Sequence, residues 1–556
     1  MNDSSNANPR PSTWERSTTR RFLRWLFSRR TLRRGFITLV WIVTLAALFY
    51  GFVDWRARRA WNAYRQDYEA KNGPLALEAY VPKVIPDESN FANTPFAREW
   101  LQPQGNTNFL FSKDTYGKGD FQPWDKKKVP KKYTKSFEDL VAWEQIYNTV
   151  QSGKALPKGG VPPGSLDLAS RRKAAIGVIN GMQEDAKALE ELRQASSRPL
   201  ARYALNYKMD DPVSILLPHL IQIKQTGARL KTRACAELAL GQSDKALQDV
   251  MLSLYLADTL KDEPFLISYL VRVVEIEIAL DTIWEGLAEH QWTDPQLQVL
   301  QQRMEGYNMI GDLEQALRAE RAFGVRIIDL IKERGLAWYS RIGDAPNIPS
   351  PQGLEEFIQN LVSFFVPAGW YDQEKLHYCQ GSDQLFQGTM DVKDRQVFPH
   401  QVKENNQTWE NLNSPGLSDS VNLRDSLRSF FWDHNLISKM LLNSLGNLPV
   451  QAASAQTVNQ AAIACALERY RIAQSHYPET LRELTKSYMP NIPRDVIDGG
   501  PYHYRTLEGD RFILYSVGWN EKDDGGVSGA RKYDRTEGDW VWTYPAEPTS
   551  SDAAAR

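Results

Sequence analysis

The clearest pattern of apolar and polar positions is an uncharged run near the N-terminus. Nineteen residues, from Gly35 to Val53, include no Asp, Glu, Lys or Arg. At about 1.5 Å per residue, a helix of this length nearly spans a hydrocarbon core of roughly 30 Å. A core helix of a soluble protein usually has a polar face, and this run has none. The pattern therefore predicts one transmembrane helix at residues 35–53.

Arginine lies unevenly around this run, which predicts its orientation. Many arginines precede the run, whereas beyond it the basic residues are mixed with the acidic Asp54, Asp67 and Glu69. Positive charge resists translocation, so we expect residues 1–34 to form a basic cytoplasmic tail at the bacterial inner membrane, with the body outside the cytoplasm. No small-x-small site closes the run, which favours an uncleaved signal anchor. The arginines before the run are Arg10, Arg16, Arg20, Arg21, Arg24, Arg29, Arg30, Arg33 and Arg34.

The next segment, residues 54–165, is rich in Pro, Gly, Asn and Lys and is predicted to be mixed and irregular. It includes a run of lysines for which two interpretations stay open. One is a solvated loop, and the other is a contact with anionic lipid headgroups or envelope polymers. The lysines are Lys126, Lys127, Lys128, Lys131, Lys132 and Lys135.

Helical periodicity dominates from residue 166 to about residue 340. Apolar residues recur every three or four positions after Asp244 and again after Pro264. Thr293 and Gln296 have the spacing of a capping box that starts a further helix. Short breaks predict antiparallel helical hairpins packed as a bundle or as a repeat-like solenoid. The stretch around Gly241 resembles a tetratricopeptide unit, although an array would need three or more clear repeats.

The C-terminal third changes character twice. Residues 341–454 are predicted to connect domains through irregular segments and short helices, with a loop at Glu404–Ser420. Residues 455–545 are predicted to form a small α+β module, in which helices precede antiparallel strands at 502–505, 512–517 and 540–544. Residues 546–556 are expected to be a disordered tail. The predicted fold class is therefore mainly α, with a transmembrane helix, a helical bundle and a small C-terminal sheet.

Several fragments of this module together resemble the globular domain of the major pseudopilins of type II secretion. They include Tyr477–Leu481, Pro493–Asp495 and Leu514–Gly518, followed by Asp523 and Asp524. The whole chain also resembles large bacterial single-pass membrane proteins that end in the same module. Gly35 begins a stretch similar to a type IV pilin start, but Val40 stands where that family has glutamate. The chain is thus not expected to be a fibre subunit.

The pseudopilin resemblance implies calcium in the loop after Gly518. Calcium takes six to eight oxygen ligands, which clustered carboxylates can supply. Carried over residue by residue, the motif points to Asp523, Asp524 and Asp539 as ligands. Lysines and arginines interrupt this loop, so a solvated acidic turn without metal is the alternative.

Composition and motifs narrow the function. A net charge of −1 argues against a nucleic-acid-binding protein. The chain lacks HExxH, Walker A, GxGxxG, CxxC and GxSxG motifs. Ser170–Lys173 has SxxK spacing without its partner motifs. Glu277, Asp281 and Glu285 repeat every four residues on an apolar helix, which is typical of a solvated face. Cys235 and Cys465 lie in alanine-rich runs and are expected to be buried.

Two hypotheses follow. The first is a non-enzymatic envelope protein that is anchored in the lipid bilayer and binds or scaffolds an envelope protein or polymer. The second is an envelope hydrolase acting on glycans or peptides, with paired carboxylates that meet in an aromatic cleft and leave no short motif.

Overall fold

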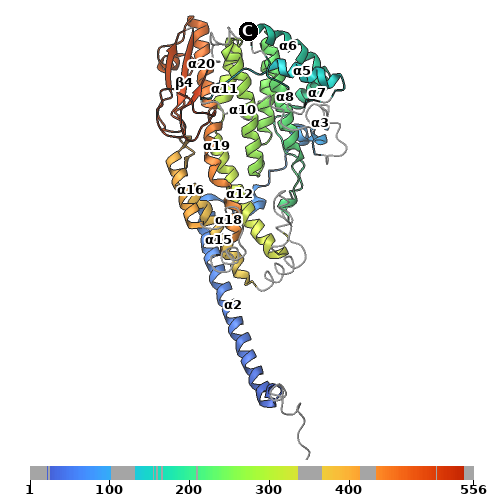
Figure 1. Cartoon of the computed structure of the whole chain (residues 1–556), viewed down its shortest axis with the longest axis vertical. Helices are drawn as coiled ribbons and strands as arrows, with labels where there is room; N and C mark the ends of the chain where they lie inside the picture. The colour runs from blue at the N-terminus through green and yellow to red at the C-terminus, as the bar shows by residue number, and fades with distance from the viewer. Residues whose placement is uncertain are drawn as a thin grey trace, which may run out of the picture. The chain divides into compact units, whose positions relative to one another are not determined.

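The computed structural model confirms the mainly helical fold class, with a long apolar helix near the N-terminus and small antiparallel sheets near the C-terminus (Figure 1). The chain divides into two compact units, residues 1–67 with 331–376 and residues 68–330 with 377–556. The structure describes residues 22, 25–101, 132–154, 156–157, 161–164, 167–207, 211–335, 338, 366–413, 434–508 and 510–543.

Helix α2 (Arg29–Asn72) contains the predicted apolar run and continues well past it. The continuation was not expected, because we predicted irregular structure from residue 54. Its sequence is rich in Ala and Arg, which favour helix, and it ends just before Gly73, whose φ is +99°. Over the continuation, Ala57 and Trp61 are buried while Arg58 is exposed. This part of α2 is therefore amphipathic, unlike the apolar run.

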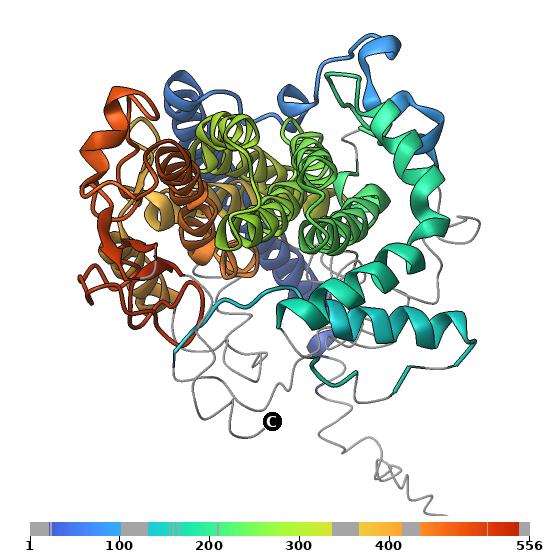
Figure 2. The same ribbon diagram turned by 90° about the horizontal axis from the view of Figure 1, so that it is seen from above.

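The helical body of the second unit begins with three 3-10 turns and short helices and then becomes a bundle. Helix α8 packs against α6, α9 and α10, and α10 also packs against α9. Figure 2 shows α8, α9 and α10 nearly end-on. A tight turn at Gly241, with φ +71°, joins α8 to α9 as an antiparallel hairpin. The helices are α3 (Pro95–Glu99), α5 (Leu140–Gln151), α6 (Leu168–Gly181), α7 (Ala186–Ala195), α8 (Pro218–Ala239), α9 (Ser243–Asp258), α10 (Leu266–Ala288), α11 (Asp294–Glu305) and α12 (Met309–Arg334).

The predicted start of α11 is confirmed. The backbone N–H of Thr293 donates to Oε1 of Gln296 at 2.9 Å, as the capping-box spacing predicts. The three cysteines are also buried as free thiols, which confirms the expectation for Cys235 and Cys465.

The connecting region is more regular than its composition suggested. It contains α15 (Ala368–Phe386), β1 (Met390–Asp391), β2 (Gln396–Val397), α16 (Pro399–Asn413), α18 (Leu436–Leu442) and α19 (Leu448–Ala455). The predicted loop at Glu404–Ser420 is therefore wrong over residues 404–413; its remainder lies outside the described residues. The polar side chains make tertiary contacts: Asn405 Nδ2 donates to the carbonyl oxygens of Leu385 and Gln387.

The C-terminal module has the expected order of elements. Helix α20 (Val458–Gln474) precedes an antiparallel sheet in the order β3 (His503–Leu507), β4 (Arg511–Ser516), β5 (Trp540–Trp542). Residues Leu481–Lys486 form a 3-10 helix. Helix α20 also packs extensively on α11 and touches α10, and all residues from Val458 to Glu468 are buried. The module therefore shares its core with the helical bundle.

Candidate functional site: an ionic cluster on helix α10

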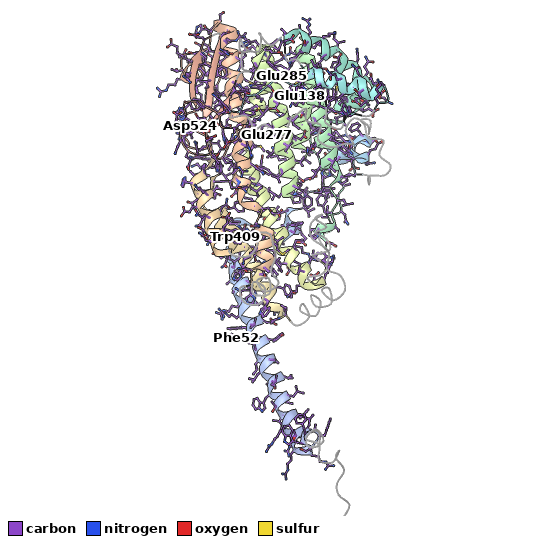
Figure 3. The ribbon with its side chains drawn as sticks, in the orientation of Figure 1. Phe52, Glu138, Glu277, Glu285, Trp409 and Asp524 are labelled. Atoms are coloured by element: carbon purple, nitrogen blue, oxygen red, sulfur yellow. The ribbon has the colours of Figure 1, made fainter. Side chains whose placement is uncertain are left out.

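The acidic row on α10 lies within a charged cluster and not on a solvated face. Residues four apart share one side of a helix, so Glu277, Asp281 and Glu285 are aligned. Figure 3 labels Glu277 and Glu285. Glu285 is only 2% exposed, and the Asp281 side chain keeps 31% exposure. The expectation of a wet face is therefore wrong at Glu285 and only partly right at Asp281.

Three lysines from different segments converge on Asp281. Lys135 Nζ lies 2.8 Å from Asp281 Oδ1, and Lys231 Nζ lies 3.3 Å from Oδ2. Lys532 Nζ, from the loop between β4 and β5, lies 3.7 Å from Oδ1. Lys231 is shared with Glu138, whose Oε2 is 3.0 Å away. One carboxylate on α10 thus binds α8, residues 132–138 and the C-terminal loop.

Aromatic rings border this cluster. Lys135 Nζ lies 4.7 Å from the centroid of the Trp284 ring and 5.9 Å from that of Trp542. The indole N–H of Trp284 donates to the carbonyl oxygen of Thr543 at 2.5 Å. The backbone N–H of Tyr133 donates to the carbonyl oxygen of Gly529 at 2.7 Å. Residues 132–138 are therefore fixed to the bundle and to the C-terminal module at once.

One turn further along α10, a second buried group continues the network. Arg171, fully buried on α6, pairs with both Glu285 and Glu289. The other oxygen of Glu285 accepts the backbone N–H of Glu138 at 2.8 Å. Each acidic group here is neutralised by a cation or a backbone donor, as buried charge requires.

Burial and neighbouring charges shift the pKa values of the cluster in both directions. Burial lowers the pKa of Lys135 to about 8, with Asp281 opposing the shift. Burial alone would raise the pKa of Asp281, but Lys135, Lys532 and Lys231 together hold it below its usual range. Burial raises the pKa of Glu285 to about 7 despite the Arg171 guanidinium. At neutral pH the Asp281 carboxylate is therefore ionised and bound by ammonium groups.

The ion pairs of this cluster hold distant segments of the chain together. Asp281 and Glu285 are each occupied by cations, so neither is placed as a free general acid or base. Groups of three or more His, Cys, Asp or Glu that could hold a metal ion do not occur among the described residues. The chemistry that the cluster supports is charge pairing between distant parts of the chain.

The predicted calcium ligands are brought only partly together. The backbone N–H groups of Asp524 and Gly526 donate to the two carboxylate oxygens of Asp539, at 3.1 and 2.6 Å. The carboxylate of Asp524 accepts from the backbone of Gly538, at 3.0 Å.

Asp523 uses its carboxylate elsewhere. One oxygen accepts from the Tyr515 hydroxyl at 3.0 Å, and the other lies 3.4 Å from His503 Nδ1. All three carboxylates are therefore engaged by hydrogen bonds or an ion pair within the protein, and hydrogen bonds to the backbone order the loop. Calcium binding stays a prediction from the resemblance.

A further charged group joins the C-terminal module to the bundle. Glu468 on α20 is 1% exposed and accepts from His290 at 2.9 Å, from Arg471 at 2.7 Å and from the Tyr477 hydroxyl at 2.6 Å. Burial would raise the pKa of Glu468, but hydrogen bonds from His290, Arg471 and Tyr477 lower it to about 2.

Sequence reasoning missed the cationic half of the cluster. Lys135 belongs to the lysine run for which a solvated loop or a contact with lipid headgroups or envelope polymers was expected, yet its side chain is only 12% exposed and binds Asp281. Arg171 lies within the SxxK spacing of Ser170–Lys173, and no local sequence pattern predicts that it is buried. The usable signal was the acidic repeat on an apolar helix, because buried carboxylates require cations.

Three comparisons tested whether the chain is similar to known proteins. No protein-family model, curated protein or solved structure matches it. The molecule itself is mainly helical, and the part of the chain that the structure describes includes one apolar helix, near the N-terminus, long enough to be a signal anchor or a signal sequence.

Proposed function

We propose that this chain is a membrane-anchored, non-enzymatic binding or scaffold protein of the bacterial envelope, whose pseudopilin-like C-terminal module lies outside the cytoplasm. The observation that carries the proposal is the exposure of the apolar run on α2. Large apolar side chains from Phe36 to Phe52 are between 36% and 67% exposed, all around the helix. Leaving such side chains in water costs on the order of 1 kcal/mol or more each, a cost that a bilayer removes.

The arrangement of the body supports a binding or scaffold role. Its charged residues pair across distant segments, which stiffens the body, and the C-terminal module is packed into the same core. A rigid body of this kind can present a surface to an envelope protein or polymer. The hydrolase alternative is less well supported, because Asp281, Glu285 and Glu468 each bind cations.

Alkaline carbonate extraction of membranes tests the anchoring. The native chain should stay in the membrane pellet. Ile42→Arg/Leu45→Arg should move it to the soluble fraction, because each arginine at the centre of a span costs about 3 kcal/mol. Val84→Arg is the matched control, since Val84 is 85% exposed but lies outside the run. Extraction of the native chain by carbonate would remove the basis of the proposal.

In-cell crosslinking tests the binding role. We expect the full chain, crosslinked with a short amine-reactive reagent, to form discrete adducts with other envelope components. The Ile42→Arg/Leu45→Arg chain should lose them, because it is no longer held at the membrane. A native chain that forms no adduct with any envelope component would contradict a scaffold.

A further inference from the structure

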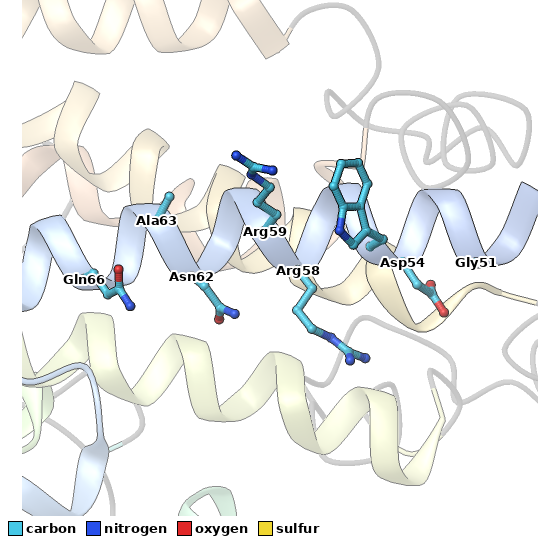
Figure 4. A pocket seen from close by; sticks show the side chains of 8 residues that line it. Gly51, Asp54, Arg58, Arg59, Asn62, Ala63 and Gln66 are labelled. Atoms are coloured by element: carbon cyan, nitrogen blue, oxygen red, sulfur yellow. The ribbon is translucent and has the colours of Figure 1, made fainter.

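A second surface lies on α2 immediately beyond the apolar run. Trp55, Arg58 and Arg59 are exposed, whereas Ala57 and Trp61 on the other side of the helix are buried. Together with neighbouring residues they line a shallow concave patch (Figure 4). The patch is lined by Gly51, Asp54, Trp55, Arg58, Arg59, Asn62, Ala63 and Gln66.

The charges of this patch are available to a partner. Among the described residues, neither Arg58 nor Arg59 forms an ion pair, and the Arg59 guanidinium lies 5.7 Å from the Trp55 ring centroid. Asp54 is engaged already, since its Oδ1 accepts the backbone N–H of Gly369 at 2.6 Å. Gly51 leaves open space, with nothing within 4 Å of where a β-carbon would lie. The patch is therefore net cationic, with an aromatic ring at its edge.

The position of the patch along the helix fixes its depth. At 1.5 Å per residue, Trp55 lies about 3 Å and Arg58 about 8 Å beyond Val53, where the apolar run ends. A bilayer adds roughly 5–7 Å of headgroup region on each side of its hydrocarbon core. Indole rings prefer this interface, and guanidinium groups bind phosphate through paired hydrogen bonds. The patch therefore coincides with the layer of lipid phosphates.

We propose that Trp55, Arg58 and Arg59 form a binding site for the phosphate headgroups of anionic phospholipids. The inference rests on the proposed membrane anchoring and adds a lipid class to it. The anionic lipid neutralises the two guanidinium groups and seats the indole at the interface, which sets the depth of α2 in the membrane.

Lipid photocrosslinking at the patch tests the site. The full chain carrying Phe52→p-benzoylphenylalanine, at an exposed position one turn before Trp55, is reconstituted in nanodiscs of equimolar phosphatidylglycerol and phosphatidylcholine, and crosslinked lipid is identified by mass spectrometry. We expect phosphatidylglycerol to exceed phosphatidylcholine by roughly fivefold or more. Adding Arg58→Gln/Arg59→Gln should bring the ratio close to one. Adding Arg172→Gln/Lys173→Gln, an adjacent exposed pair in the body, should leave it unchanged.

The outcomes separate this inference from the anchoring. Equal crosslinking of both lipids by a carbonate-resistant chain, or a preference that survives Arg58→Gln/Arg59→Gln, would overturn the headgroup site and leave the anchor intact. A chain that carbonate extracts from membranes would overturn the anchor, and the headgroup site with it.

Discussion

In the bundle core, the carboxyl group of Glu275 on α10 occupies the space beside Gly227 on α8 that a β-carbon would need. Glu275 is fully buried, and neither of its oxygens has a hydrogen-bond partner among the described residues. Burial raises its pKa well above the usual range, so the group is held as the neutral acid. Two helices therefore pack closely around a carboxyl group whose ionisation opposes folding.

Glu275→Gln should change how stability depends on pH. The folded-state pKa of Glu275 is raised, so the native chain binds this proton more tightly than the unfolded chain and loses stability as pH rises above about 4. Between pH 4 and pH 7 the free energy of unfolding of the glutamine variant should therefore rise relative to that of the native chain, by up to about 3 kcal/mol. Denaturant unfolding at both pH values measures it, with Glu184→Gln, an exposed site, as control. A difference independent of pH would contradict a neutral Glu275.

Gly227→Ala should destabilise the bundle by about 1–3 kcal/mol, because the new methyl group overlaps the Glu275 carboxyl group. Glu275→Ala should relieve much of that loss in the double variant. A double-mutant cycle by denaturant unfolding measures the coupling. Gly306→Ala, where the nearest heavy atom would be at 3.4 Å, is the control. Additive losses would show that the two residues do not compete for space.

Asp281→Asn should loosen two distant segments together. It leaves Lys135, Lys231 and Lys532 without their common carboxylate, at a cost of about 1–3 kcal/mol, since the site is partly exposed. Hydrogen–deuterium exchange should rise in residues 132–138 and 519–539. Asp262→Asn, at an exposed position, should change neither segment. Faster exchange in only one of the two would contradict the shared role of Asp281.

Glu468→Gln should remove part of the acid sensitivity of the fold. The pKa of Glu468 is depressed to about 2, so its contribution is present above about pH 4 and is lost as pH falls towards 2. The variant should lose about 3 kcal/mol at pH 7 and progressively less at lower pH. Unfolding at pH 7, 5 and 3 measures the trend against Glu479→Gln, an exposed control. An equal loss at every pH would contradict the assignment.

Asp539→Asn separates the two interpretations of the C-terminal loop. Asp539 accepts two backbone N–H groups, so the variant should lose about 1–2 kcal/mol with or without calcium. Thermal melts in calcium and in chelator measure this loss. A rise in melting temperature on adding calcium that Asp539→Asn abolishes would instead support the calcium prediction.

The sequence was informative wherever a feature is local. The apolar run, the start of α11 and the strands around Tyr504 and Leu514 follow from periodicity and capping within a few residues. The continuation of α2 past Val53 was not predicted, because its arginines are typical of a polar segment and the sequence does not show that Ala57 and Trp61 are buried.

Only the acidic residues of the ionic cluster could be predicted from the sequence. The spacing of Asp281 and Glu285 is visible on one helix, but Lys135 and Lys532 are almost 400 residues apart and meet only in the folded chain. No local pattern specifies which cation neutralises a buried carboxylate. The same limit applies to α16, where the side chain of Asn405 donates hydrogen bonds to the C-terminal end of α15 and not to water.

The most direct test of the account is the topology of the full chain in the bacterial membrane. Alkaline phosphatase and green fluorescent protein are fused in turn to the C-terminus, with an epitope at the N-terminus. An uncleaved anchor with an exported body predicts an active phosphatase, a dark fluorescent protein and an epitope that stays on the membrane-bound chain. A fluorescent C-terminal fusion with inactive phosphatase would contradict it, and loss of the epitope from the exported chain would replace the anchor by a cleaved signal sequence.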